Sequence, residues 1–368
     1  MNSLPRTGLL VLLSSFLAVL PLAAADYIDS LKVGSVELKS AGPLAFGPEG
    51  ILFVGDSMSA AVIALDTGDR APGSAAKVMD IRGIDEKVAA LLGTTPNQIM
   101  INDMAVNPIS KRTYLSISRG RGPDAMPVIL RTDGSGGLEE FSLTQVGSAS
   151  VNLPNTPDPQ VTDRSGTSLR MEAITDLAFV DDRVFVAGLS NEEFASKLRS
   201  IPFPFVKADT GTSVEIFHGS HGRFETNAPV RTFVPYEIKG VPHILAAYTC
   251  TPLVSIPVSE LKPGSKVMGK TIAELGNRNR PLDMIVYAQN GRDFILMNNS
   301  SRGVMKIPAT ALDSYGSITE PTDMAGVPYE TVDQMTGIEQ LDQLDETSGL
   351  VLQRVESGSL DLRKIALP

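Results

Sequence analysis

The chain of 368 residues carries a net charge of −10 at pH 7 and has an isoelectric point of about 4.9. This acidic balance excludes nucleic acids and anionic membranes as expected partners, because both require a basic face. The single cysteine excludes an internal disulfide, so stability has to come from packing and strand pairing.

The N-terminus has the features of a secretory signal peptide. One basic residue, Arg6, precedes an apolar run at residues 8–20, and Ala23 and Ala25 follow in the Ala-x-Ala arrangement that signal peptidase accepts. We therefore expect residues 1–25 to be a signal peptide cleaved after Ala25, which predicts a secreted or periplasmic protein. The run is too short to cross a bilayer comfortably, and no second stretch of about 18 apolar residues follows, so no membrane span is expected.

The rest of the chain contains an internal repeat. Each copy has a short strand, a turn, a second strand rich in Val, Ile, Leu and Phe, a polar hairpin and a third strand. Turn residues such as Asp181-Asp182 and Asn290-Gly291 separate the first and second strands, and the 32 Gly and 25 Pro fit a fold with many tight turns. The copies begin at Gly42, Asn102, Thr175, Arg231, Leu282 and Glu339.

Repeated antiparallel units around an axis make a β-propeller, so the repeat predicts an all-β, six-bladed β-propeller. The last copy stops after its third strand, and residues 31–39 (LKVGSVELK) form an orphan strand before the first copy. We expect this N-terminal strand to complete the last blade and close the ring without an exposed edge. Residues 26–368 would then form a single domain. Two unrelated β-sandwich domains are the alternative, which leaves the repeat unexplained.

Three segments interrupt the repeat. Residues 84–93 (IDEKVAALLG) predict a short helix between the first two blades, and residues 147–170 predict a polar loop before the third. Residues 191–199 (NEEFASKLR) predict another helical turn inside the third blade. Long loops on a rigid scaffold are common positions for functional residues.

Strand direction gathers polar residues on the face where the innermost strand of each blade begins, here called the top face. Aligning the first strands puts Asp103, Asp176 and Asp283 at one equivalent position, with Asn102 beside Asp103. Converging carboxylates and amides suit a hard cation such as Ca²⁺, so these four residues predict a polar ring at the channel mouth. The alternative is that an Asp at a strand start only caps a turn.

The three candidate soft ligands also fall on the top face. His218 and His221 lie in the link between the third and fourth blades, and Cys250 lies in a hairpin of the fourth blade. Two imidazoles and one thiolate are good ligands for copper or zinc, so these residues predict a metal site. His243 begins the second strand of that blade and should lie at the opposite end.

Two alternatives remain open for the His and Cys residues. The histidines can be hydrogen-bonded loop residues near a buried, inert thiol. Cys250 can instead be a nucleophile with His218 or His221 as its base, and Glu225 or Asp283 as the orienting acid.

Basic residues on the same face predict a rim that orients an anionic ligand through charge-assisted hydrogen bonds. The alternative is that these side chains are solvated arginines on loops. The candidate residues are Arg119, Arg121, Arg231 and Arg302.

The blade pattern over residues 31–368 resembles the six-bladed superfamily of gluconolactonase and senescence-marker type lactonases, strictosidine-synthase-like proteins and NHL-repeat proteins. In those lactonases a Glu-Gly-Pro motif, an Asn-Asp motif and a later Asp hold a divalent cation over the channel. Asn102-Asp103 and Asp283 match in type, whereas Ala41-Gly42-Pro43 stands where Glu-Gly-Pro would be. The resemblance therefore implies a calcium-dependent hydrolase that lacks one expected ligand.

Three hypotheses for function follow. The first is an exported protein that binds a metal ion or small polar ligand on its top face, and such a protein can also be catalytic. The second is a divalent-cation-dependent lactonase or esterase-like hydrolase, in which the cation polarises a carbonyl. The third is a scaffold without chemistry that binds a protein partner through its polar face.

Overall fold

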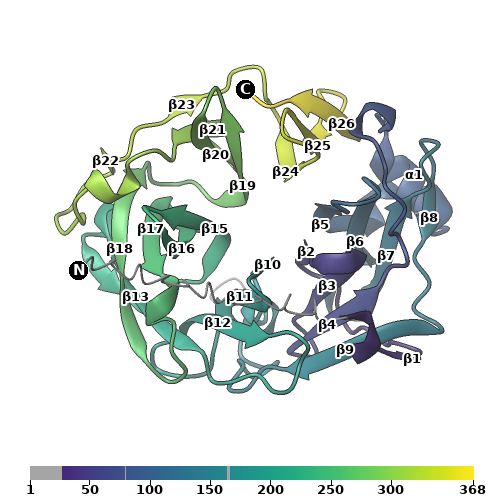
Figure 1. Cartoon of the computed structure of the whole chain (residues 1–368), viewed down its shortest axis with the longest axis horizontal. Helices are drawn as coiled ribbons and strands as arrows, with labels where there is room; N and C mark the ends of the chain where they lie inside the picture. Colours follow the sequence, from purple (N-terminus) through teal and green to yellow (C-terminus); the bar gives the residue numbers. More distant parts are fainter. Residues whose placement is uncertain (1–26, 79, 164–165) are drawn as a thin grey trace, which may run out of the picture.

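The computed structural model describes residues 27–78, 80–163 and 166–368, and β-strands make up most of its regular structure. The strands form sheets arranged like a propeller around a central channel (Figure 1). The signal peptide predicted for residues 1–25 lies outside the described residues. Within the described part of the chain, no helix is long and apolar enough to cross a membrane.

In each sheet the strands follow one another outward from an innermost strand at the channel, and all but one of the pairings along these sheets are antiparallel. The innermost strands are β2 (Leu44–Phe46), β5 (Ile99–Val106), β10 (Asp176–Val180), β15 (Val230–Ile238), β19 (Pro281–Gln289) and β24 (Ile338–Gln343). Each of them begins within three residues of the start of a predicted repeat copy. In the two-residue turn after β10, Asp181 and Asp182 both adopt positive φ, of 50° and 58°, as a tight hairpin requires.

The first two sheets are interleaved along the chain. From the channel outward, the strands are β2, β3 (Ile51–Asp56), β4 (Ala61–Asp66), β9 (Val146–Asn152) and β1 (Lys32–Gly34) in one sheet, and β5, β6 (Thr113–Arg119), β7 (Met126–Thr132) and β8 (Leu138–Glu140) in the other. The chain therefore leaves the first sheet after β4, builds the whole β5 sheet, and returns to add β9. The loop predicted for residues 147–170 is wrong in its first part, because β9 pairs along the free edge of β4.

The remaining sheets follow chain order, and the first two of them are joined at their outer edges, where the last strand of one pairs in parallel with the last strand of the other. Their strands, from the channel outward, are β10, β11 (Arg183–Leu189), β12 (Ser196–Pro202) and β13 (Thr212–His218); β15, β16 (Val241–Tyr248), β17 (Pro252–Pro257) and β18 (Lys266–Leu275); β19, β20 (Arg292–Asn299), β21 (Val304–Pro308) and β23 (Glu330–Thr331); and β24, β25 (Ser348–Arg354) and β26 (Leu360–Ala366). The helical turn predicted at residues 191–199 is wrong. Residues 196–199 belong to β12 because they pair with β11, which outweighs local helix propensity.

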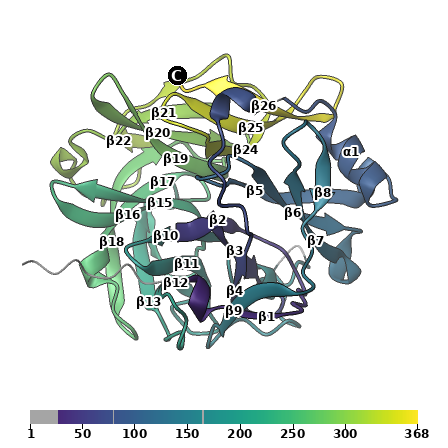
Figure 2. The ribbon, with the colours of Figure 1, turned by 45° about the vertical axis from the view of Figure 1, so that its right-hand side comes forward.

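The order of the sheets around the channel differs from their order in the sequence. The innermost strand β2 contacts β5 on one side and β10 on the other, and β5 contacts β24 (Figure 1). Figure 2 shows the same neighbours from a second direction. The ring therefore closes between the β5 sheet and the β24 sheet.

The predicted closure by the N-terminal strand is wrong. Within residues 31–39, β1 pairs with β9 at the outer edge of the first sheet and not with the last sheet. Ring closure instead involves the segment before α1 (Ile84–Leu91), where Ile81 and Leu362 exchange two backbone hydrogen bonds of 2.9 Å. The carboxylates of Asp80 and Asp85 accept the N–H groups of Lys364 and Leu360, so side chains supply acceptors that a further strand would have supplied.

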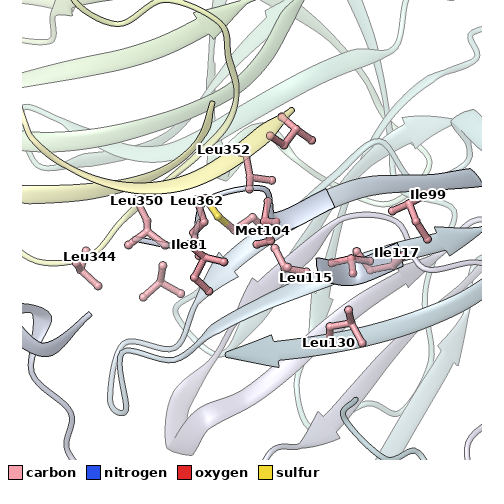
Figure 3. Packing of buried hydrophobic residues seen from close by; sticks show 14 of the residues in the cluster. Ile81, Ile99, Met104, Leu115, Ile117, Leu130, Leu344, Leu350, Leu352 and Leu362 are labelled. Atoms are coloured by element: carbon pink, nitrogen blue, oxygen red, sulfur yellow. The ribbon is translucent and has the colours of Figure 1, made fainter. Parts of the chain in front are cut away.

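A buried apolar cluster lies at this closure (Figure 3). Ile81, in the segment before α1, packs with Met104 of β5, Leu115 of β6 and Leu362 of β26. The predicted helix at residues 84–93 is confirmed as α1, whose buried residues join the same cluster. The hydrophobic contacts thus connect the C-terminal sheet to the β5 sheet.

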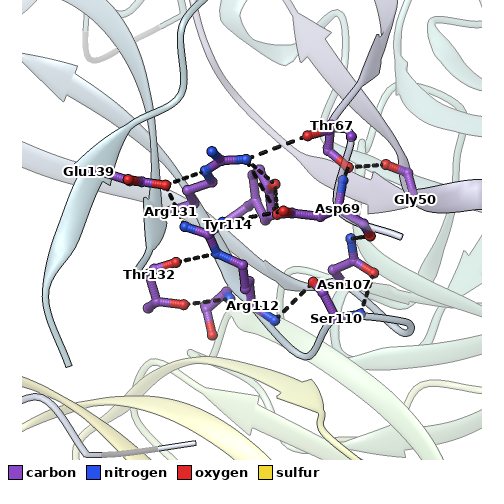
Figure 4. A network of polar contacts seen from close by, with 12 residues as sticks. Gly50, Thr67, Asp69, Asn107, Ser110, Arg112, Tyr114, Arg131, Thr132 and Glu139 are labelled. Atoms are coloured by element: carbon purple, nitrogen blue, oxygen red, sulfur yellow. Dashed lines mark hydrogen bonds and ion pairs between the residues drawn. The ribbon is translucent and has the colours of Figure 1, made fainter. Parts of the chain in front are cut away.

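A polar network fixes the chain where it crosses from β4 toward β26 (Figure 4). Asp69 accepts hydrogen bonds from the Tyr114 hydroxyl, from Arg112 at 3.2 Å and from Arg131 at 3.4 Å. Four residues later, a Cβ on Gly73 would lie 1.8 Å from the Ser110 carbonyl oxygen, so only glycine fits. The chain after β4, at residues 69–73, is therefore held tightly against the β5 sheet.

We expect Ile81→Ala to lower the free energy of unfolding by about 2–4 kcal/mol, because it opens a cavity in the closure cluster. Val33→Ala in β1, where the side chain is 72% exposed, should change it by less than about 0.5 kcal/mol. Urea denaturation of both variants measures the difference. Equal losses would contradict closure at Ile81.

Candidate metal centre

His218 and His221 lie at a sharp reversal of the chain. His218 is the last residue of β13, a single 3₁₀ turn covers Gly219–His221, and β14 (Arg223–Glu225) then pairs back against β13. Gly222 has a φ of 63°, which lets the chain reverse within these few residues. The reversal brings both imidazoles to one end of the sheet, with His218 buried and His221 partly exposed.

Cys250 lies in the hairpin between β16 and β17, as predicted from the sequence. Both Cys250 and Thr251 adopt positive φ, of 64° and 57°, a conformation that costs energy for residues other than glycine. The backbone N–H of Cys250 donates to the Asn279 carbonyl at 2.6 Å, and that of Thr251 donates to the Tyr248 carbonyl at 2.8 Å. These bonds hold the thiol in a fixed, half-buried position.

The structure brings the three side chains together. The potential ligand atoms of His218, His221 and Cys250 all lie within 4.8 Å of one another. The two imidazole rings are 3.8 Å apart between centroids and tilted by 34°. His243 lies near the start of β16, where its Nδ1 is 2.7 Å from the Val241 carbonyl oxygen, and it is not part of the cluster.

Glu225 orients both imidazoles. Its two carboxylate oxygens lie 2.8 Å from Nδ1 of His218 and 2.7 Å from Nδ1 of His221. Nε2 of each ring is therefore left for another partner, and that of His218 is buried without one among the described residues. Burial favours the neutral form of Glu225, but the hydrogen bonds from the two histidines outweigh it and lower the pKa of Glu225 to about 2.

A second carboxylate supports the turn that carries the histidines. Glu274, near the end of β18, accepts the N–H of Gly219 at 2.5 Å. Burial raises the pKa of Glu274 to about 7, which the Gly219 hydrogen bond only partly offsets. Glu225 was named from the sequence as one of two candidate orienting acids for a Cys250 nucleophile, whereas Glu274 was not selected.

The three aligned aspartates connect neighbouring innermost strands. A β-bulge precedes Asp103 and Asp283, and each side chain reaches the next sheet along the ring. The backbone N–H donors are Leu44 to Asp103 at 2.7 Å, Phe233 to Asp176 at 2.7 Å and Leu341 to Asp283 at 2.9 Å. Their carboxylate oxygens are thus already used as acceptors.

Asp342 forms the same kind of hydrogen bond to a neighbouring sheet. The alignment of the repeat copies did not select it, because in the last copy it lies two residues after the position that matches Asp103, Asp176 and Asp283. Its carboxylate accepts the Val106 N–H at 2.6 Å, across the closure between β24 and β5. Asn102 also links sheets, since its amide donates to the Ala41 carbonyl at 2.7 Å. These residues therefore form inter-sheet contacts along the channel.

The four aspartates line a cavity of about 460 Å³ in the channel, so each keeps some contact with solvent although protein surrounds it. Burial raises the pKa of Asp103 to about 8, that of Asp176 to about 7 and that of Asp342 to about 6. Burial and the nearby Asp103 charge raise the pKa of Asp283 well above its ordinary value. A large share of these carboxyls is therefore protonated at neutral pH.

The predicted basic rim is largely engaged with protein groups. Arg121 donates to the carbonyls of Asn97 and Ile99, and Arg302 donates to that of Asn277. Arg231 forms an ion pair of 2.6 Å with Glu172 and donates to Thr249, next to Cys250. Arg119 lies at the end of β6. Of these four residues, Arg231 is the one whose contacts connect it to the Cys250 hairpin.

Comparisons with known proteins identify no family. No family model matches the chain, and no curated protein sequence matches it. Among solved structures, the PQQ-bound aldose sugar dehydrogenase from Streptomyces coelicolor matches at 13% identity and a TM-score of 0.38, over 92% of this chain and 97% of that one. A putative glucose dehydrogenase from Thermus thermophilus matches at 12% identity and a TM-score of 0.35, over 91% and 100%.

An engineered GH43 glycoside hydrolase also matches, at 12% identity and a TM-score of 0.36, over 74% of this chain and 51% of that one. Likenesses this weak carry no argument about activity, so the fold assignment rests on the strand pairing described above. The resemblance to the gluconolactonase group stays a prediction.

We expect the stability of the protein to fall as the pH rises from 5 to 8. The folded-state pKa of Asp176, about 7, lies above its ordinary value of 3.8, so its contribution is fully present below that ordinary value and is lost as the pH rises through 7. Asp176→Asn should reduce this slope, measured by urea denaturation at each pH. Glu356→Gln, an exposed carboxyl between β25 and β26, should keep the wild-type slope. An unchanged slope in Asp176→Asn would show that the raised pKa of Asp176 does not cause the fall in stability.

Proposed function

We propose that this protein is an exported, six-bladed β-propeller that binds a zinc or copper ion through His218, His221 and Cys250. The observation that carries the proposal is the convergence of two imidazoles and one thiol, with both Nδ1 atoms held by a single carboxylate. Metal-ligating histidines commonly donate their second ring N–H to a carboxylate in this way.

The spacing of the donors supports this proposal. Zinc binds nitrogen at about 2.0–2.1 Å and sulfur at about 2.3 Å, so donors around a tetrahedral ion lie about 3.3–3.6 Å apart. The three donors lie within 4.8 Å of one another, and a closure of about 1 Å would complete the site. His221 is partly exposed on a short turn, so it is the ligand best able to move.

The donor chemistry favours zinc or copper over calcium. Imidazole and thiolate suit zinc and copper, whereas calcium takes oxygen ligands. The aspartates proposed as a calcium ring already accept backbone N–H groups, which gives them a structural role. Three protein ligands leave a fourth position open for water or a small ligand, as in catalytic zinc sites.

A second candidate function is cysteine-dependent hydrolysis. Glu225 binds Nδ1 of each histidine, and each Nε2 is left to act as a base toward Cys250. A nucleophile, a base and an orienting acid are thus adjacent, which is the arrangement that activated thiols require. Absence of metal combined with rapid alkylation of Cys250 near neutral pH would favour this function.

We expect wild-type protein, purified without chelators, to carry about one equivalent of zinc or copper by elemental analysis. Cys250→Ser and His221→Ala should lose it, because each removes a ligand. His243→Ala is the matched control, since this histidine lies outside the cluster, and it should retain the metal. Protein without metal that also fails to bind added zinc or copper would refute the proposal.

Glu225→Gln should weaken zinc binding by about 10–100-fold without abolishing it, because the histidines lose the carboxylate that orients them. Competition titration with a zinc chelator measures the affinity. Glu260→Gln, an exposed carboxyl after β17, serves as the control and should leave the affinity unchanged. An unchanged affinity in Glu225→Gln would remove its positioning role.

A further inference from the structure

A cavity of about 180 Å³ lies at the ring closure, in different sheets from the candidate metal centre. Its walls come from the segment between β4 and α1, the β5–β6 turn, the β7–β8 turn and β26, and we call it the closure pocket. Ile81 and Leu362, which exchange the closing hydrogen bonds, both line it. A water molecule takes about 30 Å³ in the liquid, so the closure pocket has room for about six waters, which suits a small ion.

The closure pocket is lined by cationic side chains and, among the described residues, by no Asp or Glu. The cations are Lys77, Lys111 and Arg112. Lys364 adds a further positive charge close by, since its Nζ lies 2.8 Å from the Ala75 carbonyl oxygen, two residues before Lys77. The chain as a whole carries a net charge of −10, so the lining of this pocket is opposite in sign to the molecule that contains it.

The charge of Arg112 is already compensated. Its Nη1 lies 3.2 Å from Asp69, its Nη2 pairs with Glu139 and its Nε donates to the Thr132 carbonyl. Arg131 forms ion pairs with the same two carboxylates. Two arginines therefore balance two carboxylates in this network, and Arg112 brings no free charge to the closure pocket.

The two lysines form no ion pair with any described residue, although Lys111 is half-buried and Lys77 is exposed. The acid that interacts with Lys111 is Asp342 in the channel. Burial raises the pKa of Asp342, and the Lys111 charge is the weakest of the influences that oppose this rise, after the hydrogen bonds from the N–H groups of Val106 and Gln343. Lys77 and Lys111 therefore bring the uncompensated positive charge of the closure pocket.

We propose that the closure pocket binds a small oxyanion through the ammonium groups of Lys77 and Lys111, with inorganic phosphate as the probe. The two lysines come from different walls, one from the segment between β4 and α1 and one from the β5–β6 turn. An oxyanion offers several acceptor oxygens to donors on different sides, and hydrogen bonds between charged groups are stronger than those between neutral ones. The bound ion would connect the segment that closes the ring to the β5 sheet.

The test is isothermal titration calorimetry with sodium phosphate at constant ionic strength. Wild-type protein should bind phosphate, and Lys77→Gln combined with Lys111→Asn should weaken binding by about tenfold or more, because two charge-assisted hydrogen bonds are lost. Asparagine suits position 111 because the residue there has a φ of 62°. Lys207→Gln, at an exposed lysine in the loop after β12, is the control and should bind as the wild type does. Absence of binding by the wild type, or equal binding by the double variant, would overturn the proposal.

A second measurement locates the ion in protein with unaltered lysines. In ¹⁵N NMR spectra, phosphate should shift the amide signals of Gly134 and Gly136, which line the closure pocket, and leave that of Gly240 in the β15–β16 turn unchanged. Shifts at all three glycines, or at none, would overturn the proposal. Cys250→Ser, which lacks a proposed metal ligand, should bind phosphate as the wild type does. Loss of binding in that variant would place the ion at the metal instead, so the two proposals fail separately.

Discussion

The aspartates on the channel wall are the contact on which the ring depends. At the channel, neighbouring sheets meet through side chains, because their innermost strands share no backbone ladder, whereas at the outer edge β13 and β18 pair in parallel. Asp103, Asp176, Asp283 and Asp342 supply the missing acceptors, and each receives one N–H from the next sheet in the same direction around the ring. Burial in the channel raises the pKa of these carboxyls, and the backbone N–H groups that they accept offset this rise only in part.

In the candidate metal centre the pKa of the carboxyl is lowered, whereas burial in the channel raises the pKa values of the aspartates. Glu225 remains ionised because it receives hydrogen bonds from two histidines, so it can fix both rings by their Nδ1 atoms. The ligands come from two chain reversals, one closed by Gly222 and one that holds Cys250 at positive φ. The thiol is therefore held at a backbone position that favours glycine, and strain of this kind is concentrated at functional sites.

Much of the fold could be predicted, because each repeat copy carries its own turn residues and buried second strand. The order of the sheets could not, because it depends on β9 pairing with β4 across an intervening sheet, and no local pattern records such a pairing. Strand direction predicted the convergence of His218, His221 and Cys250. Glu225 was one of two candidate orienting acids in the sequence, but its contact with both imidazoles at once depends on side-chain positions that only the folded chain contains.

The position of ring closure has a consequence for how the chain folds. Closure joins residues 278 positions apart in sequence, such as Gly83 and Asp361, so it has a very high contact order. Many strands of the propeller can pair locally as the chain is synthesised, but the backbone hydrogen bonds between residues 80–85 and β26 cannot form until the C-terminal strands emerge. Folding of this protein should therefore end with a slow step in which its last-made sheet docks onto a segment made much earlier.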